Sequence, residues 1–231
     1  MITCALLQLL KDSGKNVLSY KCGPDYIDPM FHKKVLGVPS KNLDTFFTDE
    51  KTTVQLFLDE RADGDFAVLE GVMGLYDGLG GIYEQGSSYH LAKVTQTPII
   101  LVVDAKGMGK SVLALIAGFL QYDTQHLIKG VLLNRMSKGY YDIIKPLIEK
   151  SFVKVVGYFP EQKDIGFQAD IWGLVMPDEL SDIKKQLNET ADRLKKTIDM
   201  ALFMDIAEAA NEIGDSENAD VYNEKIIMKK I

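Results

Sequence analysis

Five charged side chains stand where the chain leaves two apolar runs that have the pattern of buried strands. Lys21, Asp25 and Asp28 follow the first run, and Glu70 and Asp77 end or follow the second. In open α/β sheets, the loops after the carboxyl ends of the strands hold the ligands. A lysine there can neutralise phosphate charge, and carboxylates can bind a divalent cation. The spacing therefore predicts a site for phosphate, a divalent cation and an anionic substrate.

The first of these loops carries its own conformational restraints. Residues 21–29 read Lys-Cys-Gly-Pro-Asp-Tyr-Ile-Asp-Pro, so Pro24 and Pro29 restrict the backbone on both sides of the two aspartates. This pattern favours a pre-ordered loop at a binding site. A simpler role stays open, because Asp25 and Asp28 are also residue types that shape turns.

Composition excludes several classes of protein. The 231 residues are 46% hydrophobic and 26% charged, which is ordinary for a globular protein. A formal net charge of −7 argues against a nucleic-acid partner. No apolar run approaches the ~20 residues of a membrane span, and the first residues lack the pattern of a signal peptide. Two cysteines make neither a disulfide framework nor a zinc site. A cytoplasmic location is expected.

The periodicity of the chain alternates between strands and helices. Apolar runs predict strands at 17–20, 65–70, 98–103, 128–134 and 153–159. Helical spacing predicts helices at 2–13, 43–61 with a break near residue 48, 87–96, 110–122, 140–150 and 180–212. Such alternation indicates an α/β fold with a doubly wound, mostly parallel sheet.

A phosphate-binding α/β protein of this kind usually opens with a strand, a glycine-rich loop and a helix. Here the chain opens inside that helix, at Ile2, and contains no G-x-x-x-x-G-K-[ST] motif. Residues 107–111 (Gly-Met-Gly-Lys-Ser) have the wrong spacing and are interpreted as a tight strand-to-helix turn. We predict a P-loop NTPase-like fold without its first strand and phosphate loop, and weak or no ATP binding by this chain alone. Inactivity of the truncated chain alone stays open.

Six motifs together resemble the cobyrinic acid a,c-diamide synthase family, whose N-terminal domain is similar to dethiobiotin synthetase. They stand in the family's order at residues 20–29, 42–44, 70–78, 102–104, 131–135 and 172–175. The first and third are long and unusual, which makes the match specific. The resemblance covers roughly residues 1–203.

The resemblance implies an ATP-dependent ligase of cobalamin biosynthesis. In that family ATP phosphorylates the a and c side-chain carboxylates of the corrinoid substrate, and ammonia from glutamine displaces the phosphate to leave an amide. The implied cofactors are ATP and Mg²⁺. Residues 1–205 are expected to be the synthetase domain, truncated at its N-terminus. Residues 206–231 are expected to be a linker toward a glutamine amidotransferase domain absent here. A homodimer stays open.

The resemblance also implies roles for individual residues. Catalytic roles in phosphoryl transfer and acyl-phosphate stabilisation fall to Lys21, Asp25, Asp28 and Asp77, and Mg²⁺ binding falls to Glu70. The residues implied for substrate binding are Tyr26, Ile27, Asp44 and Tyr76. Those implied for contacts with the nucleotide are Asn134 and Arg135.

Other readings stay open beside this one. A nickel-tetrapyrrole a,c-diamide synthase shares the motifs. A dethiobiotin-synthetase-like ligase is disfavoured, because the run at residues 23–28 is the corrinoid family's version of that loop. A partitioning-type ATPase would not explain Asp25 and Asp28. Cys22 and the three histidines, which are scattered, are interpreted as structural.

Overall fold

A computed structural model describes residues 1–61, 64, 66–162, 180–210 and 225–230. Its strands are β1 (Val17–Cys22), β2 (Ser40–Leu43), β3 (Phe66–Glu70), β4 (Ile99–Asp104), β5 (Ile128–Asn134), β6 (Lys154–Phe159) and β7 (Lys225–Lys230). Its helices are α1 (Ile2–Asp12), α2 (Ile27–Phe31), η1 (His32–Leu36), α3 (Glu50–Arg61), η2 (Leu79–Gly81), α4 (Ser88–Val94), α5 (Ser111–Tyr122), α6 (Lys138–Ser151), α7 (Leu180–Lys195) and α8 (Met200–Glu208). None of these helices is long and apolar enough to cross a bilayer. The motif at residues 172–175 lies outside the described residues.

The strands form one seven-stranded sheet in the order β2-β1-β3-β7-β4-β5-β6. Every pair of neighbouring strands is parallel. This confirms the predicted α/β fold with a doubly wound parallel sheet. Because the strands are parallel, their carboxyl ends meet at one edge, and the polar residues that end them are brought together there.

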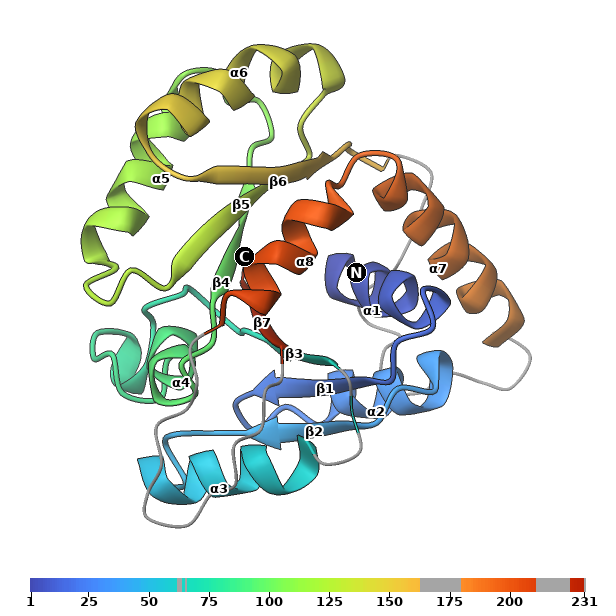
Figure 1. Ribbon diagram of the computed structural model, residues 1–231, viewed down its shortest axis with the longest axis vertical. Coiled ribbons are helices and arrows are strands. Elements are labelled where there is room, and N and C mark those ends of the chain that lie inside the picture. Colours follow the sequence, from blue (N-terminus) through green and yellow to red (C-terminus); the bar gives the residue numbers. More distant parts are fainter. Residues whose placement is uncertain (62–63, 65, 163–179, 211–224, 231) are drawn as a thin grey trace.

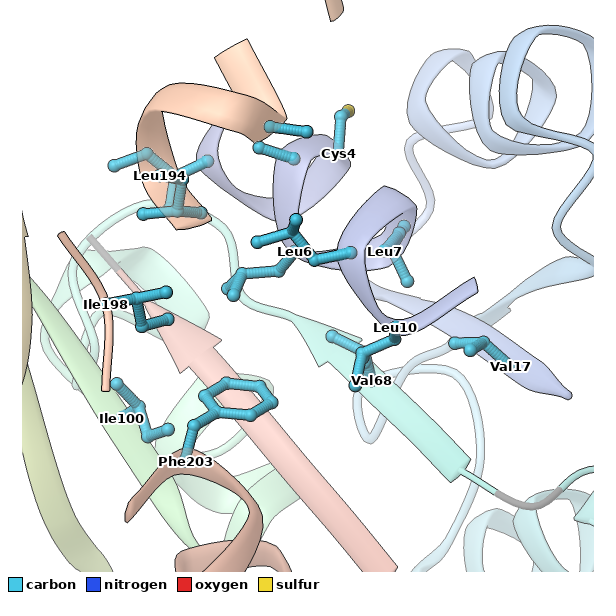
Figure 2. Close-up of a cluster of buried hydrophobic side chains, with 14 of the residues drawn as sticks. Cys4, Leu6, Leu7, Leu10, Val17, Val68, Ile100, Leu194, Ile198 and Phe203 are labelled. Atoms are coloured by element: carbon cyan, nitrogen blue, oxygen red, sulfur yellow. The ribbon is translucent and has the colours of Figure 1, made fainter. Parts of the chain in front are cut away.

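Helices cover both faces of the sheet (Figure 1), and an apolar core lies beneath them on each face. On one face, α1, α7 and α8 pack on alternate strand residues such as Val68 and Ile100, and Figure 2 shows this cluster around Leu6, Leu194 and Phe203. On the other face, α3, α4, α5 and α6 pack on the residues between them, such as Leu69 and Leu101. The strands are apolar on both faces because both faces are buried.

Three elements near the first motif were not predicted. Residues 27–36, expected to be loop, form the short helices α2 and η1, and Pro29 lies in the first turn of α2, where a proline is tolerated. Strand β2 is polar in its middle and lies at the edge of the sheet, so its four residues give no apolar run. Both α2 and β2 contribute to the site described below.

The predicted helix over 180–212 is two helices. Between α7 and α8, the chain pairs with β6: Asp199 donates its backbone N–H to the carbonyl oxygen of Val156 at 2.7 Å, and the carbonyl oxygen of Thr197 accepts from Tyr158 at 3.2 Å. The side chain of Asp199 then caps α8 by accepting from the N–H of Leu202. Apolar residues recur at helical intervals on both sides of the break, because α7 and α8 each bury an apolar face in the same core.

The sheet is continuous where the sequence led us to expect a missing strand. Strand β7 lies in the middle of the sheet, paired with β3 on one side and β4 on the other. Residues 206–231 were expected to be a linker, but α8 runs to Glu208 and Lys225–Lys230 form this strand. Residues 211–224 and 231 of that predicted linker lie outside the described residues.

Candidate active site

A buried lysine lies at the centre of the site. Strands β1 and β3 are parallel neighbours, and their register sets Lys21 beside Glu70 at the carboxyl edge of the sheet. The side chain of Lys21 is only 7% exposed. Its ammonium group forms an ion pair with Asp28 and lies 3.9 Å from Oε2 of Glu70. Burying an ammonium group is costly unless it is paired, and these two carboxylates supply the pairing.

The loop after β1 separates the roles of its two aspartates. Oδ1 of Asp25 accepts the backbone N–H of Ile27 at 2.9 Å, which is a turn that leads into α2. Asn42 of β2 fixes the same loop, because its Nδ2 donates to the carbonyl oxygens of Gly23 and Asp25, both at 2.7 Å. Asp25 therefore shapes the loop, whereas Asp28, on α2, reaches the ammonium group.

Glu70 is held by two residues that the sequence analysis did not place in the site. The hydroxyl of Thr3, at the start of α1, donates to Oε1 of Glu70, and Nε2 of His32 lies 3.7 Å from its Oε2. On its other side, Nδ1 of His32 lies 2.9 Å from the hydroxyl of Ser19. His32 was interpreted as structural, and the structure places it against a proposed metal ligand.

The sequence does carry a signal for His32. It follows Asp28 by four residues, and α2 continues into η1, so the two side chains lie on one face of a continuous helical segment. Thr3 has no comparable signal. It contacts Glu70 across 67 positions of sequence, and only the packing of α1 on the sheet brings them together.

Burial and the neighbouring carboxylates together set the charges of the site. Burial opposes the charge on Lys21, but the attraction of Glu70, Asp28 and Asp25 outweighs it, so the pKa of Lys21 lies above its ordinary value. Burial lowers the pKa of His32, although Glu70 and Asp28 pull in the opposite direction. At neutral pH the cluster therefore holds a cationic Lys21 beside a neutral imidazole.

Two residues of the loop that follows β3 have structural contacts. Oδ2 of Asp77 accepts the backbone N–H of Gly74 at 2.8 Å and closes a turn. Tyr76 points to α5, where its hydroxyl donates to the carbonyl oxygen of Phe119 at 2.6 Å. Burial, together with the negative charge of Asp123, raises the pKa of Tyr76 above its ordinary value. The structure thus places neither side chain against Lys21, and their expected roles in catalysis and substrate binding remain predictions.

The remaining residues expected to bind substrate stand around the loop. Tyr26 precedes α2 with 71% of its surface exposed, and Ile27 begins that helix, half-buried. Asp44 follows β2, and its Oδ1 accepts the N–H of Phe46 at 2.8 Å. Tyr26 is the one of these three that offers its side chain most openly to solvent.

The residues expected to contact the nucleotide follow β5. Asn134 ends that strand, and the side chain of Arg135 forms a two-pronged ion pair with Asp104 at the end of β4. The nearby residues 105–110 lead into α5 through a turn in which Met108 donates its N–H to the carbonyl oxygen of Ala105 at 3.0 Å. A tight turn is what the spacing at residues 107–111 predicted.

The oxygen atoms of Glu70 and Thr3 suit a magnesium ion that is bound together with a nucleotide. Within the described residues, no three His, Cys, Asp or Glu side chains are grouped to hold a metal ion. Mg²⁺ in phosphate-transfer sites uses one or two carboxylates, with water and phosphate oxygens supplying the rest. Glu70, with the Thr3 hydroxyl beside it, fits that mode. Both cysteines are buried and free of disulfides, so neither is presented as a nucleophile.

Comparison with known proteins agrees with the motifs. A cobyrinate a,c-diamide synthase of Listeria innocua is 35% identical over 94% of the chain and 48% of its own length. One from Clostridium acetobutylicum is 33% identical over 99% of the chain and 52% of its own length. One from Thermoplasma volcanium is 37% identical over 91% of the chain and 46% of its own length.

The chain spans about half the length of the curated relatives that it matches. No family model matches it, and no solved structure does. The resemblance predicted from the motifs is confirmed by these relatives: the chain is a homologue of the cobyrinate a,c-diamide synthases along nearly all of its own length.

Proposed function

We propose that this chain is the synthetase part of a cobyrinate a,c-diamide synthase, which amidates the a and c carboxylates of cobyrinate with ATP and with ammonia from glutamine. The observation that carries the proposal is the buried Lys21 between the partly buried carboxylates of Asp28 and Glu70, in a chain similar to these synthases over 94% of its length. Buried charges at a ligand-binding edge are typical of catalytic sites.

The proposed first step is phosphoryl transfer to a substrate carboxylate. When bound, Mg-ATP supplies the phosphoryl group, and ADP leaves. Lys21 is cationic and held on one side by Asp28, so it can neutralise charge on the substrate carboxylate and on the phosphoryl group as it moves. Because the lysine is buried, its charge acts in surroundings poorer in water, where electrostatic effects are stronger.

In the second step, ammonia attacks the acyl carbon, phosphate leaves, and a proton is lost. Asp25, on the loop after β1, and Asp28, on α2, are proposed to meet the substrate, and Asp77 is proposed to act from the loop after β3. Glu70 and the Thr3 hydroxyl are the proposed ligands of magnesium. Asn134 and Arg135 are proposed to contact the nucleotide at the other end of the same edge.

The proposal includes the setting expected for such an enzyme. The ammonia comes from a glutamine-hydrolysing domain, the location is the cytoplasm, and no nucleic acid or membrane takes part. A nickel tetrapyrrole is the alternative substrate, but the matched relatives carry the cobyrinate name.

Binding of cobyrinate and formation of its amides test the proposal. The chain is titrated with cobyrinate by equilibrium dialysis, then supplied with Mg-ATP and ammonium chloride, and the corrinoid is analysed by mass spectrometry. We expect saturable binding of cobyrinate and, at Mg-ATP concentrations high enough to overcome the weak ATP binding predicted for this chain, amide and inorganic phosphate formed in equal amounts. A Lys21→Met variant should form no amide. A chain that binds a nickel tetrapyrrole but not cobyrinate would favour the alternative, and one that binds neither contradicts the proposal.

A further inference from the structure

A pocket lies beside the active site, at the β2 edge of the sheet. It has a volume of about 590 Å³. The residues that line it are Tyr26, Pro29, Met30, Lys33, Lys34, Ser40, Lys41 and Asn42. Three of these eight are lysines and none is acidic, in a chain whose net charge is −7. The pocket is therefore a local concentration of positive charge on an acidic protein, which favours an anionic ligand.

One helical segment builds both the pocket and the active site. Tyr26, Met30, Lys33 and Lys34 are spaced as neighbours on one face of α2 and η1. Asp28, on the same segment, is paired with Lys21. The pocket therefore shares its helical segment with the aspartate that pairs with Lys21.

The opposite wall comes from β2 and is joined to the active-site loop. In the sheet register, Lys41 lies beside Tyr20 and Asn42 lies beside Lys21. Asn42 also donates two hydrogen bonds to the loop between β1 and α2. These contacts join the wall of the pocket to the loop that follows Lys21. A single ligand can therefore occupy the pocket and the active site together.

The ligand chemistry follows from the lining. Ammonium groups attract carboxylates or phosphates, whereas Tyr26 and Met30 offer apolar surface to a ring system. The nucleotide is proposed to lie toward Asn134 on β5, and β2 is at the opposite end of the strand order from β5 and β6. A tetrapyrrole that carries several carboxylates satisfies both kinds of lining.

We propose that this pocket binds carboxylate side chains of the tetrapyrrole that are not being amidated, through Lys33, Lys34 and Lys41, and so positions the reacting carboxylate at Lys21. This inference rests on the proposed function. It makes the three lysines determinants of substrate affinity and of which side chain is amidated.

The test compares two triple variants with the same change of charge. Lys33→Gln, Lys34→Gln and Lys41→Gln remove the lysines of the pocket. The control removes three exposed lysines at the other end of the sheet, through Lys129→Gln, Lys150→Gln and Lys154→Gln. The Kd for cobyrinate is measured by equilibrium dialysis at low and high salt. Circular dichroism checks that both variants fold.

We expect the pocket variant to raise the Kd roughly tenfold or more at low salt, with a smaller salt dependence, and the control to change it less than about twofold. Cobyrinate with esterified carboxylates should bind wild type and pocket variant alike. If the pocket variant instead binds Mg-ATP and inorganic phosphate more weakly, with its affinity for cobyrinate unchanged, the pocket is a phosphate site and the inference is overturned. Equal values of Kd for the two variants would also overturn it, with the proposed function intact. A wild-type chain that does not bind cobyrinate refutes both.

Discussion

Two groups of charged residues lie along the same carboxyl edge of the sheet, and they differ in burial. At the ends of β1 and β3, the side chain of Lys21 is 7% exposed between Asp28 and Glu70. At the ends of β4 and β5, the side chains of Arg135 and Asp104 are 39% and 45% exposed. Both groups satisfy their charges by ion pairing, but only in the first is the cation buried, with its carboxylates 25% and 18% exposed.

The difference shows why an ion pair alone does not identify a site. An exposed ion pair contributes little to the free energy of unfolding, because water screens the charges and competes for their hydrogen bonds. A buried lysine depends on its carboxylates, and replacing it with a hydrocarbon side chain leaves them without a cation. Buried charged groups with shifted pKa values cluster at functional sites. The comparison therefore predicts strong effects at β1 and β3 and weak ones at β4 and β5.

The largest effect is expected from Lys21→Met. It leaves Asp28 and Glu70 close together without their cation, and we expect it to lower the free energy of unfolding by about 3 kcal/mol. The matched variant Arg135→Met removes an exposed cation and should leave the denaturation midpoint unchanged. Urea denaturation followed by circular dichroism measures both. Equal losses of stability in the two variants would show that burial does not separate these regions.

Glu70→Gln comes next, because it removes a charge and keeps the shape. The amide oxygen of glutamine can still accept the hydroxyl of Thr3, so the contact with α1 is retained. Loss of a metal ligand should lower the rate of amide formation about 100-fold at saturating Mg-ATP, as for other electrostatic groups of active sites. Asp104→Asn, at the end of β4, should lower it by no more than roughly threefold. A rate for Glu70→Gln within threefold of wild type would remove Glu70 from the metal site.

The regular elements were predictable wherever burial decided them. The strand over 98–103 is apolar throughout because both of its faces are covered, and the structure has β4 there. Strand β2 was missed because an edge strand keeps polar residues. Strand β7 was missed because it joins the sheet far along the chain from both of its partners, and that pairing leaves no local pattern.

The site was predictable as a set of positions but not as a set of contacts. Strand ends placed Lys21 and Glu70 at one edge, and the parallel register confirms that placement. Which aspartate reaches the lysine depends on where α2 begins. That helix was not predicted, because it is short and its segment contains two prolines. Thr3 was missed because its contact with Glu70 is made by tertiary packing alone.

A pair of asparagine substitutions tests the division of roles within the loop. Asp28→Asn leaves Lys21 with one carboxylate fewer, and we expect the rate of amide formation to fall at least tenfold. Asp25→Asn keeps an oxygen that can accept the N–H of Ile27, so its effect should stay within about threefold. Steady-state rates at saturating cobyrinate decide this, and a larger effect of Asp25→Asn would place that residue in the chemistry.

The smallest effect is expected at Tyr76, where the structure shows anchoring contacts to α5. Tyr76→Phe removes the hydrogen bond to the carbonyl oxygen of Phe119 and keeps the packing against Tyr89 and Tyr122. We expect it to lower the free energy of unfolding by about 1 kcal/mol. The Kd for cobyrinate should stay unchanged, because the lost hydroxyl is directed to α5 and the aromatic ring is retained. The raised pKa of Tyr76 adds a second readout, because this tyrosine stabilises the fold below pH 10.0 and loses that contribution as the pH rises further. Tyr76→Phe should therefore make stability fall less steeply in alkaline solution. A weaker affinity for cobyrinate with unchanged stability would instead place the hydroxyl in the substrate site.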